Sequence, residues 1–468
     1  MENPKNESKK PAGKKRWLGK IASPDYLDVV WEHLTESLCE EVFQAHRKTE
    51  RQRKWTLHAL IWFWIGLLQL RYSSQTRGLL EARAGHPLFP KVDASPEAFF
   101  QKIQNVRPIF FESLFTAFNH ATKKEWPKNF CAEFADLDFP AIMVADGSRL
   151  EQVARRLKIT RTTTKAILPG SMEALYDLRR GQLCSLHFDP DGFASELSMF
   201  EKVLPDIPAG ALLLADRYYP KPVIWRELEA REIFMVSRHN KTVKKKRVKI
   251  LKTLRAKKLS VDDWIVEMGG SEHGTQPVLL RWVRVWSADF DITLLTNVLD
   301  PKKLSPQQLL ALYRSRWSIE RMYLAMKDVL ELNHLYNCSP AAVGQQTFAT
   351  AILYNALRLS QAKAAAAAGI AADMISVGKF FPTVIENFMK LTFMEVGGEH
   401  LFAQLARANP GLQPVRVRHT HPSLDLELRH FLVEKRSDKR KKRRYCAGRR
   451  QSTSFSKIPG AKKYVKLT

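Results

Sequence analysis

Four side chains able to bind metal or phosphate recur at helical spacing in the second half of the chain. They are Tyr313, Arg316, Glu320 and Lys327, which at roughly 100° per helical residue fall within about 60° of one another. Apolar residues beside this stripe would bury the flank of the helix and leave Glu320 at the lip of a groove. A carboxylate there could hold a metal ion. The ordinary alternative is a solvated helix face on which Arg316 and Glu320 form an i,i+4 ion pair.

Two aspartates upstream each end a short apolar run. Asp146 follows residues 141–145 and Asp216 follows residues 211–215, and such continuously apolar runs are typical of strands covered on both faces. A single strand-end aspartate is often a turn former or a helix cap. Three carboxylates from separate elements, however, can bind two Mg²⁺ (or Mn²⁺) ions about 3.5–4 Å apart, which clamp the attacking and leaving oxygens of a phosphodiester. The pattern therefore predicts phosphoryl transfer.

The combined motif resembles a known family. With Asp146-Gly147-Ser148 and residues 216–219 (Asp-Arg-Tyr-Tyr) before it, the Tyr-x2-Arg-x3-Glu-x6-Lys spacing resembles that of the DDE transposases of the insertion-sequence four group, over about residues 140–360. The resemblance implies a ribonuclease-H-like catalytic core. It also implies two groups of site residues: the metal ligands and catalytic residues Asp146, Asp216 and Glu320, and the DNA-binding residues Tyr313, Arg316 and Lys327.

The chain departs from the family at two positions. Tyr218 stands where many relatives have glycine, and Ile292 stands where some hairpin-forming relatives have a tryptophan that stacks a flipped base. Trp282 and Trp286 are close by in the sequence and could provide such a stacking platform, or could simply cover a small sheet. A hairpin intermediate is implied only by the resemblance.

Composition excludes several classes of protein. The chain has 468 residues, 45% of them hydrophobic, which is enough for two or three domains. Its longest apolar run, residues 59–68, is short of the roughly twenty residues that span a bilayer, so no membrane partner is expected. The lysine-rich N-terminus lacks the apolar segment of a secretory signal, and the five cysteines form no C-x-x-C pair. We expect a cytoplasmic, nucleoid-associated protein of a bacterium.

The net charge predicts a polyanionic partner. Lys and Arg number 75 against 48 Asp and Glu, a formal charge of +27. Two runs hold much of the excess: residues 241–258 have ten basic residues and no acid, and residues 435–450 have ten basic residues and one acid. Either run could be a solubilising segment. We interpret them as phosphate contacts, and in the first run assign DNA binding to Lys244, Lys245, Lys246 and Arg247.

We predict an α/β protein in which an α-helical N-terminal domain precedes a ribonuclease-H-like core carrying a β-rich insertion. The predicted segments are a disordered basic N-terminus (1–20), an α-helical DNA-binding domain (21–130), the first part of the core (131–237), the insertion (238–305), the second part of the core with C-terminal helices (306–407) and a basic tail (408–468). The helical domain could instead only pack on the core. Among the smaller elements, Ser95 and Pro96 predict a helix start, residues 172–189 a hairpin turning at Gly181, and residues 424–433 a short helix.

These patterns and the resemblance together predict a cut-and-paste DNA transposase of an insertion sequence. It would cleave strands at the terminal inverted repeats and join them to target DNA, through a hairpin, as a homodimer in the synaptic complex. Two alternatives share its charge: a metal-dependent nuclease of the same fold that does not join strands, and a catalytically inactive DNA-binding regulator. Only the two enzymes need the three carboxylates.

Overall fold

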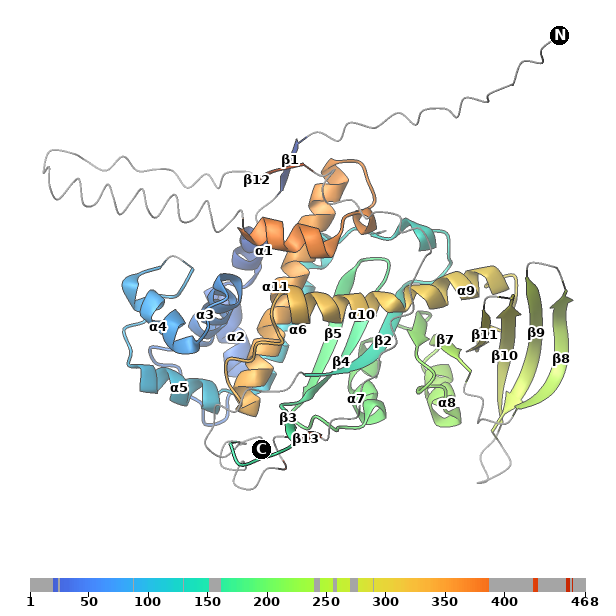
Figure 1. The fold of residues 1–468 in the computed structure, drawn as a ribbon, viewed down its shortest axis with the longest axis horizontal. Helices are drawn as coiled ribbons and strands as arrows, with labels where there is room; N and C mark the ends of the chain where they lie inside the picture. The colour runs from blue at the N-terminus through green and yellow to red at the C-terminus, as the bar shows by residue number, and fades with distance from the viewer. Residues whose placement is uncertain are drawn as a thin grey trace, which may run out of the picture.

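The protein is a mixed α/β structure built on one nine-stranded sheet (Figure 1). The structure, a computed structural model, describes residues 20–23, 26–86, 88–128, 130–150, 161–239, 245–255, 259–269, 277–288, 290–386, 424–427, 452–454 and 457. Lys244, nearly all of the predicted N-terminal segment and the basic run 435–450 lie outside these residues. No helix within the described residues is long and apolar enough to cross a membrane.

Six α-helices precede the sheet in the described part of the chain: α1 (Tyr26–His33), α2 (Glu36–His46), α3 (Leu57–Leu70), α4 (Gln75–Ala84), α5 (Pro96–Asn105) and α6 (Pro108–Ala121). Two short 3-10 turns follow, η1 (Thr122–Lys124) and η2 (Ala132–Phe134). The start of α5 is confirmed: the Ser95 hydroxyl accepts from the Ala98 N–H, and Pro96 occupies the first turn. Helix α3 is apolar all round because nearly all of it is buried.

The first half of the sheet has the strand order β5-β4-β2-β6-β7. Its strands are β2 (Ile142–Arg149), β4 (Ser171–Asp177), β5 (Gln182–Asp189), β6 (Leu212–Ala215) and β7 (Phe234–Arg238). Strands β2, β6 and β7 are parallel, whereas β4 runs antiparallel to both β2 and β5. The predicted hairpin is confirmed, and Gly181 in its turn has a φ of +67°, which favours glycine.

The sheet continues beyond β7 through the segment predicted as an insertion. Its strands follow in the order β11 (Asp291–Thr296), β10 (Val278–Trp286), β9 (Ser260–Met268) and β8 (Lys245–Leu254), and all four pairings from β7 outward are antiparallel. A β-rich segment was expected here, with strands over residues 264–268, 278–286 and 291–297. Strand β8 was not expected, because its basic sequence lacks the alternation of apolar and polar residues that marks a half-buried strand.

Helices cover both faces of the sheet. Ile142 and Val144 of β2 pack in one core with the N-terminal helices, α10 (Trp317–Leu324) and α11 (Pro340–Ala367), whereas Met143 packs in a second core with α7 (Glu196–Val203) and α8 (Pro222–Ala230). Because both faces of β2 are buried, its sequence is continuously apolar. The long helix α11 contacts both the N-terminal helices and strand β5 of the sheet. Its Gln345 amide accepts from the Trp64 indole at 3.1 Å and donates to the carbonyls of Ile103 and Val106.

Segments distant in sequence pair in two small sheets. Strand β12 (Leu424–Glu427) runs antiparallel to β1 (Lys20–Ser23), and β13 (Ser452–Ser454) runs parallel to β3 (Ala166–Leu168). The helix predicted from residue 424 is therefore wrong over 424–427, where the alternating Leu-Asp-Leu-Glu sequence forms a strand. After α11, η6 (Ala372–Met374) leads to a helical stretch over residues 377–386.

A candidate active site at the ends of two parallel strands

The two aspartates predicted from the sequence lie on adjacent parallel strands. The last β2–β6 pair is Val144 with Leu214, so Asp146 and Asp216 follow this ladder by two residues each, in the same direction. Asp216 comes directly after β6, whereas β2 continues to Arg149 in pairing with β4 alone. Side chains that follow neighbouring parallel strands meet at one edge of a sheet, where the crevices of α/β proteins form.

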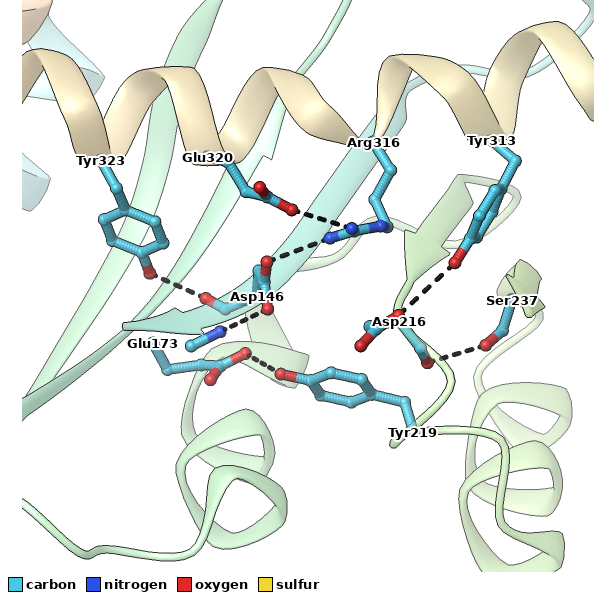
Figure 2. A network of polar contacts seen from close by, with 10 residues as sticks. Asp146, Glu173, Asp216, Tyr219, Ser237, Tyr313, Arg316, Glu320 and Tyr323 are labelled. Atoms are coloured by element: carbon cyan, nitrogen blue, oxygen red, sulfur yellow. Dashed lines mark hydrogen bonds and ion pairs between the residues drawn. The ribbon is translucent and has the colours of Figure 1, made fainter. Parts of the chain in front are cut away.

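Helices α9 (Pro306–Ser315) and α10, which carry Tyr313 and Glu320 on either side of Arg316 and are together called the signature helix, lie across this edge and complete a polar network (Figure 2). The Arg316 guanidinium donates from Nη1 to Asp146 Oδ2 at 3.1 Å and from Nη2 to Glu320 Oε1 at 2.8 Å. The Tyr313 hydroxyl donates to Asp216 Oδ1 at 3.5 Å. The structure thus brings together the three predicted acids and two of the three predicted phosphate-binding residues.

Arg316 is a buried residue, only 8% exposed. The ordinary i,i+4 pair with Glu320 exists, but the same guanidinium also holds Asp146, which is 170 residues away in sequence. A solvated helix face therefore does not describe Arg316. The Arg316 guanidinium neutralises the Asp146 and Glu320 carboxylates at a partly buried site. Replacing Arg316 would leave both acids without their cationic partner.

The signature helix is not uniform, in contrast to the regular helix predicted from the spacing. Helix α9 (Pro306–Ser315) ends one residue before Arg316, whose N–H bonds the Tyr313 carbonyl three residues back. After α10, residues Ala325–Val329 form a π-helical turn, labelled η5, which closes with a bond from the Leu330 N–H to the Ala325 carbonyl. Such π turns are frequent at functional sites. The turn contains Lys327, whose ammonium donates to the Arg149 carbonyl at 2.7 Å.

Two hydroxyls hold the backbone of the two aspartates. The Tyr323 hydroxyl donates to the carbonyl of Asp146 at 2.7 Å, and the Ser237 hydroxyl donates to the carbonyl of Asp216 at 2.8 Å (Figure 2). Each contact fixes the main chain from which a carboxylate projects. Neither role was predicted, because a bond to a backbone carbonyl leaves no motif in the sequence.

A fourth acid lies buried beneath the site. Glu173 on β4 faces Gly147 of β2 and is fully buried, and its Oε1 accepts from the Tyr219 hydroxyl at 2.9 Å. Its Oε2 has no hydrogen-bond partner within the described residues, and a Cβ on residue 147 would lie only 2.9 Å from that oxygen. Burial, reinforced by the nearby charge of Asp146, raises the pKa of Glu173 to about 9. Glycine at position 147 therefore makes room for a protonated carboxyl.

The electrostatics of Asp146 reflect its acidic neighbours. Burial is the largest cause that raises its pKa to about 6; Arg316 opposes this shift, and the charges of Glu320 and Asp216 add to it. Carboxylates that repel one another are a suitable donor set for a hard divalent cation such as Mg²⁺ or Mn²⁺. No three His, Cys, Asp or Glu side chains of the described residues are grouped to hold one ion as they stand. The Arg316 guanidinium lies between Asp146 and Glu320 and bonds both carboxylates.

Part of the chain is similar to a known protein family. Residues 160–356 match the family model of the transposase DDE domain. The matched segment contains Asp216 and Glu320 and begins after Asp146. A protein of Sinorhizobium fredii named "Putative transposase y4zB" is 30% identical over 164 residues, which is 33% of this chain and 44% of that protein. The chain thus matches less than half the length of this relative.

The basic residues assigned from the first cationic run lie elsewhere. Lys245, Lys246 and Arg247 are exposed on β8, the last strand of the sheet, so the structure does not bring them to the acidic network. Lys245 lies 4.6 Å above the Trp282 ring. Trp282 is 6% exposed and stacks on Trp264 with ring centroids 4.7 Å apart, so it covers the sheet, as the alternative interpretation holds.

Proposed function

We propose that this chain is a DNA transposase that catalyses metal-dependent strand cleavage and strand transfer at the ends of a mobile element. The observation that carries the proposal is the convergence of Asp146, Asp216 and Glu320, from three separate elements, on a network organised by Arg316. The match of residues 160–356 to the transposase DDE domain supports the assignment of this network to DNA chemistry.

The fold proposal is a ribonuclease-H-like core interrupted by an insertion. Three observations support it: the strand order β5-β4-β2-β6-β7, the parallel pairing of β2, β6 and β7, and helices on both faces of the sheet. The insertion would then be the antiparallel strands β8 to β11. In the same proposal, the helices between residues 21 and 130 bind the terminal inverted repeats.

Asp146, Asp216 and Glu320 would hold two divalent cations, Mg²⁺ or Mn²⁺. When bound, the cations supply Lewis-acid stabilisation of the charge that develops on the reacting phosphate. Arg316 would offer its planar fork to a phosphate oxygen of the DNA. Tyr313 and Lys327 are further donors for phosphates near the cleaved end. Tyr323, Ser237 and the Glu173–Tyr219 pair would keep the aspartate backbone in place throughout.

The finer assignment follows the insertion-sequence four group. The chain would cut and paste its element through a hairpin on the element end, acting as a homodimer in the synaptic complex. The substrates would be double-stranded DNA of its own terminal inverted repeats and of the target site.

The test is a cleavage assay on duplexes carrying the element ends, with Mg²⁺ or Mn²⁺ and the full chain. The isosteric variants Asp146→Asn, Asp216→Asn and Glu320→Gln should each lose cleavage by about a hundredfold or more. DNA affinity should change little, because the acids do not attract DNA. Glu229→Gln, at an exposed position of α8, is the matched control.

The products separate the remaining alternatives. Cleavage with joining to target DNA supports the transposase. Cleavage without joining identifies a nuclease, and duplex binding without cleavage under either metal identifies a regulator. Cleavage that survives all three substitutions would remove the acidic network from the mechanism.

A further inference from the structure

A cationic hollow lies in the N-terminal helices, away from the acidic network. Its volume is about 850 Å³, and its walls are the connection between α2 and α3 and one side of α5 with the residues that flank this helix. It is lined by six basic side chains: Lys48, Arg51, Arg53, Lys54, Lys102 and Arg107. In Figure 1 these helices and the basic strand β8 lie on opposite sides of α10. The hollow is thus a separate positive surface from β8.

Two of the six cations serve the protein itself. The Arg107 guanidinium donates to Glu50 at 2.6 Å and to the carbonyl of His46, while the Lys102 ammonium donates to the carbonyl of Arg51 at 2.6 Å. Among the described residues, Glu50 is the only acid that lines the hollow, and Arg107 neutralises it. These hydrogen bonds tie the connection between α2 and α3 to Lys102 and Arg107.

The other four cations stand at the rim. Lys48, Arg51, Arg53 and Lys54 are exposed, and no ion pair to Lys48, Arg51 or Arg53 occurs within the described residues. Lys54 reaches Asp93 at 3.5 Å, but both side chains are mostly in solvent, where such a pair contributes about 0–1 kcal/mol. The rim therefore keeps an excess of positive charge.

The connection that carries the rim is anchored by buried and hydrogen-bonded side chains. The Trp55 ring is buried against Phe63 and Phe99, and the Gln52 side chain accepts from the Leu57 N–H at 2.6 Å. A prearranged set of cations binds at a lower entropic cost than a flexible tail does. The sequence also indicates this positive surface, although no prediction was based on it: residues 47–54 contain five basic residues and one acid.

The placement of these charges distinguishes between possible anions. A site for a small anion would direct buried donors at one point, but the buried cations here bond protein groups. Exposed cations spread along a rim, next to the neutral donors Thr49, Ser95 and Gln101, suit an extended row of phosphates. We propose that this hollow binds the phosphate backbone of a DNA duplex, an inference that rests on the DNA-directed function proposed above and gives it a specific surface.

The test compares two variants with equal changes in charge. Arg51→Glu with Arg53→Glu should weaken binding of a fluorescein-labelled random duplex to the full chain by about tenfold or more. It should also reduce the slope of log affinity against log salt by about 2, because each phosphate that a cation neutralises accounts for about 0.9. Lys123→Glu with Lys124→Glu, exposed in η1 outside the hollow, should stay within about threefold of wild type.

A charge-neutralising double variant and a small-anion control complete the test. Arg51→Gln with Arg53→Gln, which only neutralises the charges, should reduce the slope by about the same amount, with a smaller loss of affinity and an unchanged melting temperature. If the hollow variants bind the duplex as the control does, the proposal is overturned. It is also overturned if inorganic pyrophosphate protects only the wild type from melting while the duplex affinities of all variants agree, since the site would then be one for small anions.

The experiments distinguish a failure of the proposal for the hollow from a failure of the proposed transposase function. A wild type that binds duplex through the hollow but never cleaves the element ends supports the hollow and removes the transposase. A wild type that cleaves, with hollow variants that bind as the control does, removes only the hollow. A wild type that binds no duplex overturns both.

Discussion

Arg316 holds two of the three candidate metal ligands at once, so its removal tests the charge balance of the site. Without divalent cations, Arg316→Ala leaves Asp146 and Glu320 as neighbouring carboxylates without the cation that bonds both. Because Glu320 is partly exposed, we expect a loss of about 2–3 kcal/mol in the free energy of unfolding, below the range for fully buried pairs. Chemical denaturation measures it.

Magnesium should restore part of this stability in the Arg316→Ala variant and less in the wild type. The cation binds the folded state, and in the variant no guanidinium competes for the carboxylates. Arg314→Ala, at an exposed position two residues earlier, serves as the control and should lose little. Equal responses to Mg²⁺ in wild type and variant would show that Arg316 does not occupy a cation site.

Glu173 gives the stability of the protein a pH dependence of known sign. Its pKa is raised from an ordinary value of 4.5 to about 9, so between these limits the folded chain holds a proton that the unfolded chain has lost. Stability therefore falls as the pH rises through this window. Glu173→Gln keeps an acceptor for Tyr219 but cannot ionise, so its melting temperature should fall less between pH 6.5 and about 9. An unchanged pH profile would contradict the buried, protonated state.

The residues of the site differ in how far the sequence reveals them. Asp146, Asp216 and Glu320 could be found because two of them end apolar strands and the third belongs to a spaced motif. Glu173 could not, because its position beneath the site depends on the β2–β4 register that sets it opposite Gly147. The sequence shows Tyr323 only as an apolar position of the helix, although its hydroxyl donates to the backbone carbonyl of Asp146.

At the scale of elements, predictions succeeded where one local rule governs the segment. Continuous apolar runs identified β2 and β6, and a serine followed by proline identified the start of α5. The predictions failed where contacts between segments distant in sequence determine the local structure. Strand β8 consists largely of exposed residues and forms because β9 offers a partner, and the interruption of the signature helix at Arg316 coincides with its reach to Asp146.

The stacked tryptophans of β9 and β10 allow a test of what this part of the sheet does. Trp282→Ala should lower the free energy of unfolding by about 3–5 kcal/mol, the usual cost of truncating a large buried aromatic residue. Trp317→Ala, which removes a ring that is 55% exposed on α10, should cost much less. Urea denaturation of both variants provides the measurement. A stable Trp282→Ala protein with impaired DNA cleavage would reverse our interpretation and make Trp282 a base-stacking residue.

At the scale of the whole molecule, charge and chemistry are separated. The acids gather where the pairing of β2 with β6 ends, in the interior of the sheet, whereas exposed cations lie on β8 at its edge and around the hollow in the N-terminal helices. A net charge of +27 attracts DNA from any direction, but attraction alone gives no sequence preference. The acidic site needs nearby donors such as Arg316 to bring a polyanion close to three carboxylates.

The basic run 435–450 should add affinity without specificity, and the fold dictates how to test it. Truncation before residue 435 would also remove β13, which pairs with β3, so the basic residues are better replaced by glutamine within the full chain. Binding to element-end and random duplexes should weaken by the same factor, with the slope of log affinity against log salt reduced by about 0.9 for each phosphate that the run no longer neutralises. The hollow variants, measured beside it and combined with it, show whether the two sets of cations contribute additively. An unchanged slope would mean that the run does not touch DNA, and a weakening confined to element-end duplex would mean that it reads sequence.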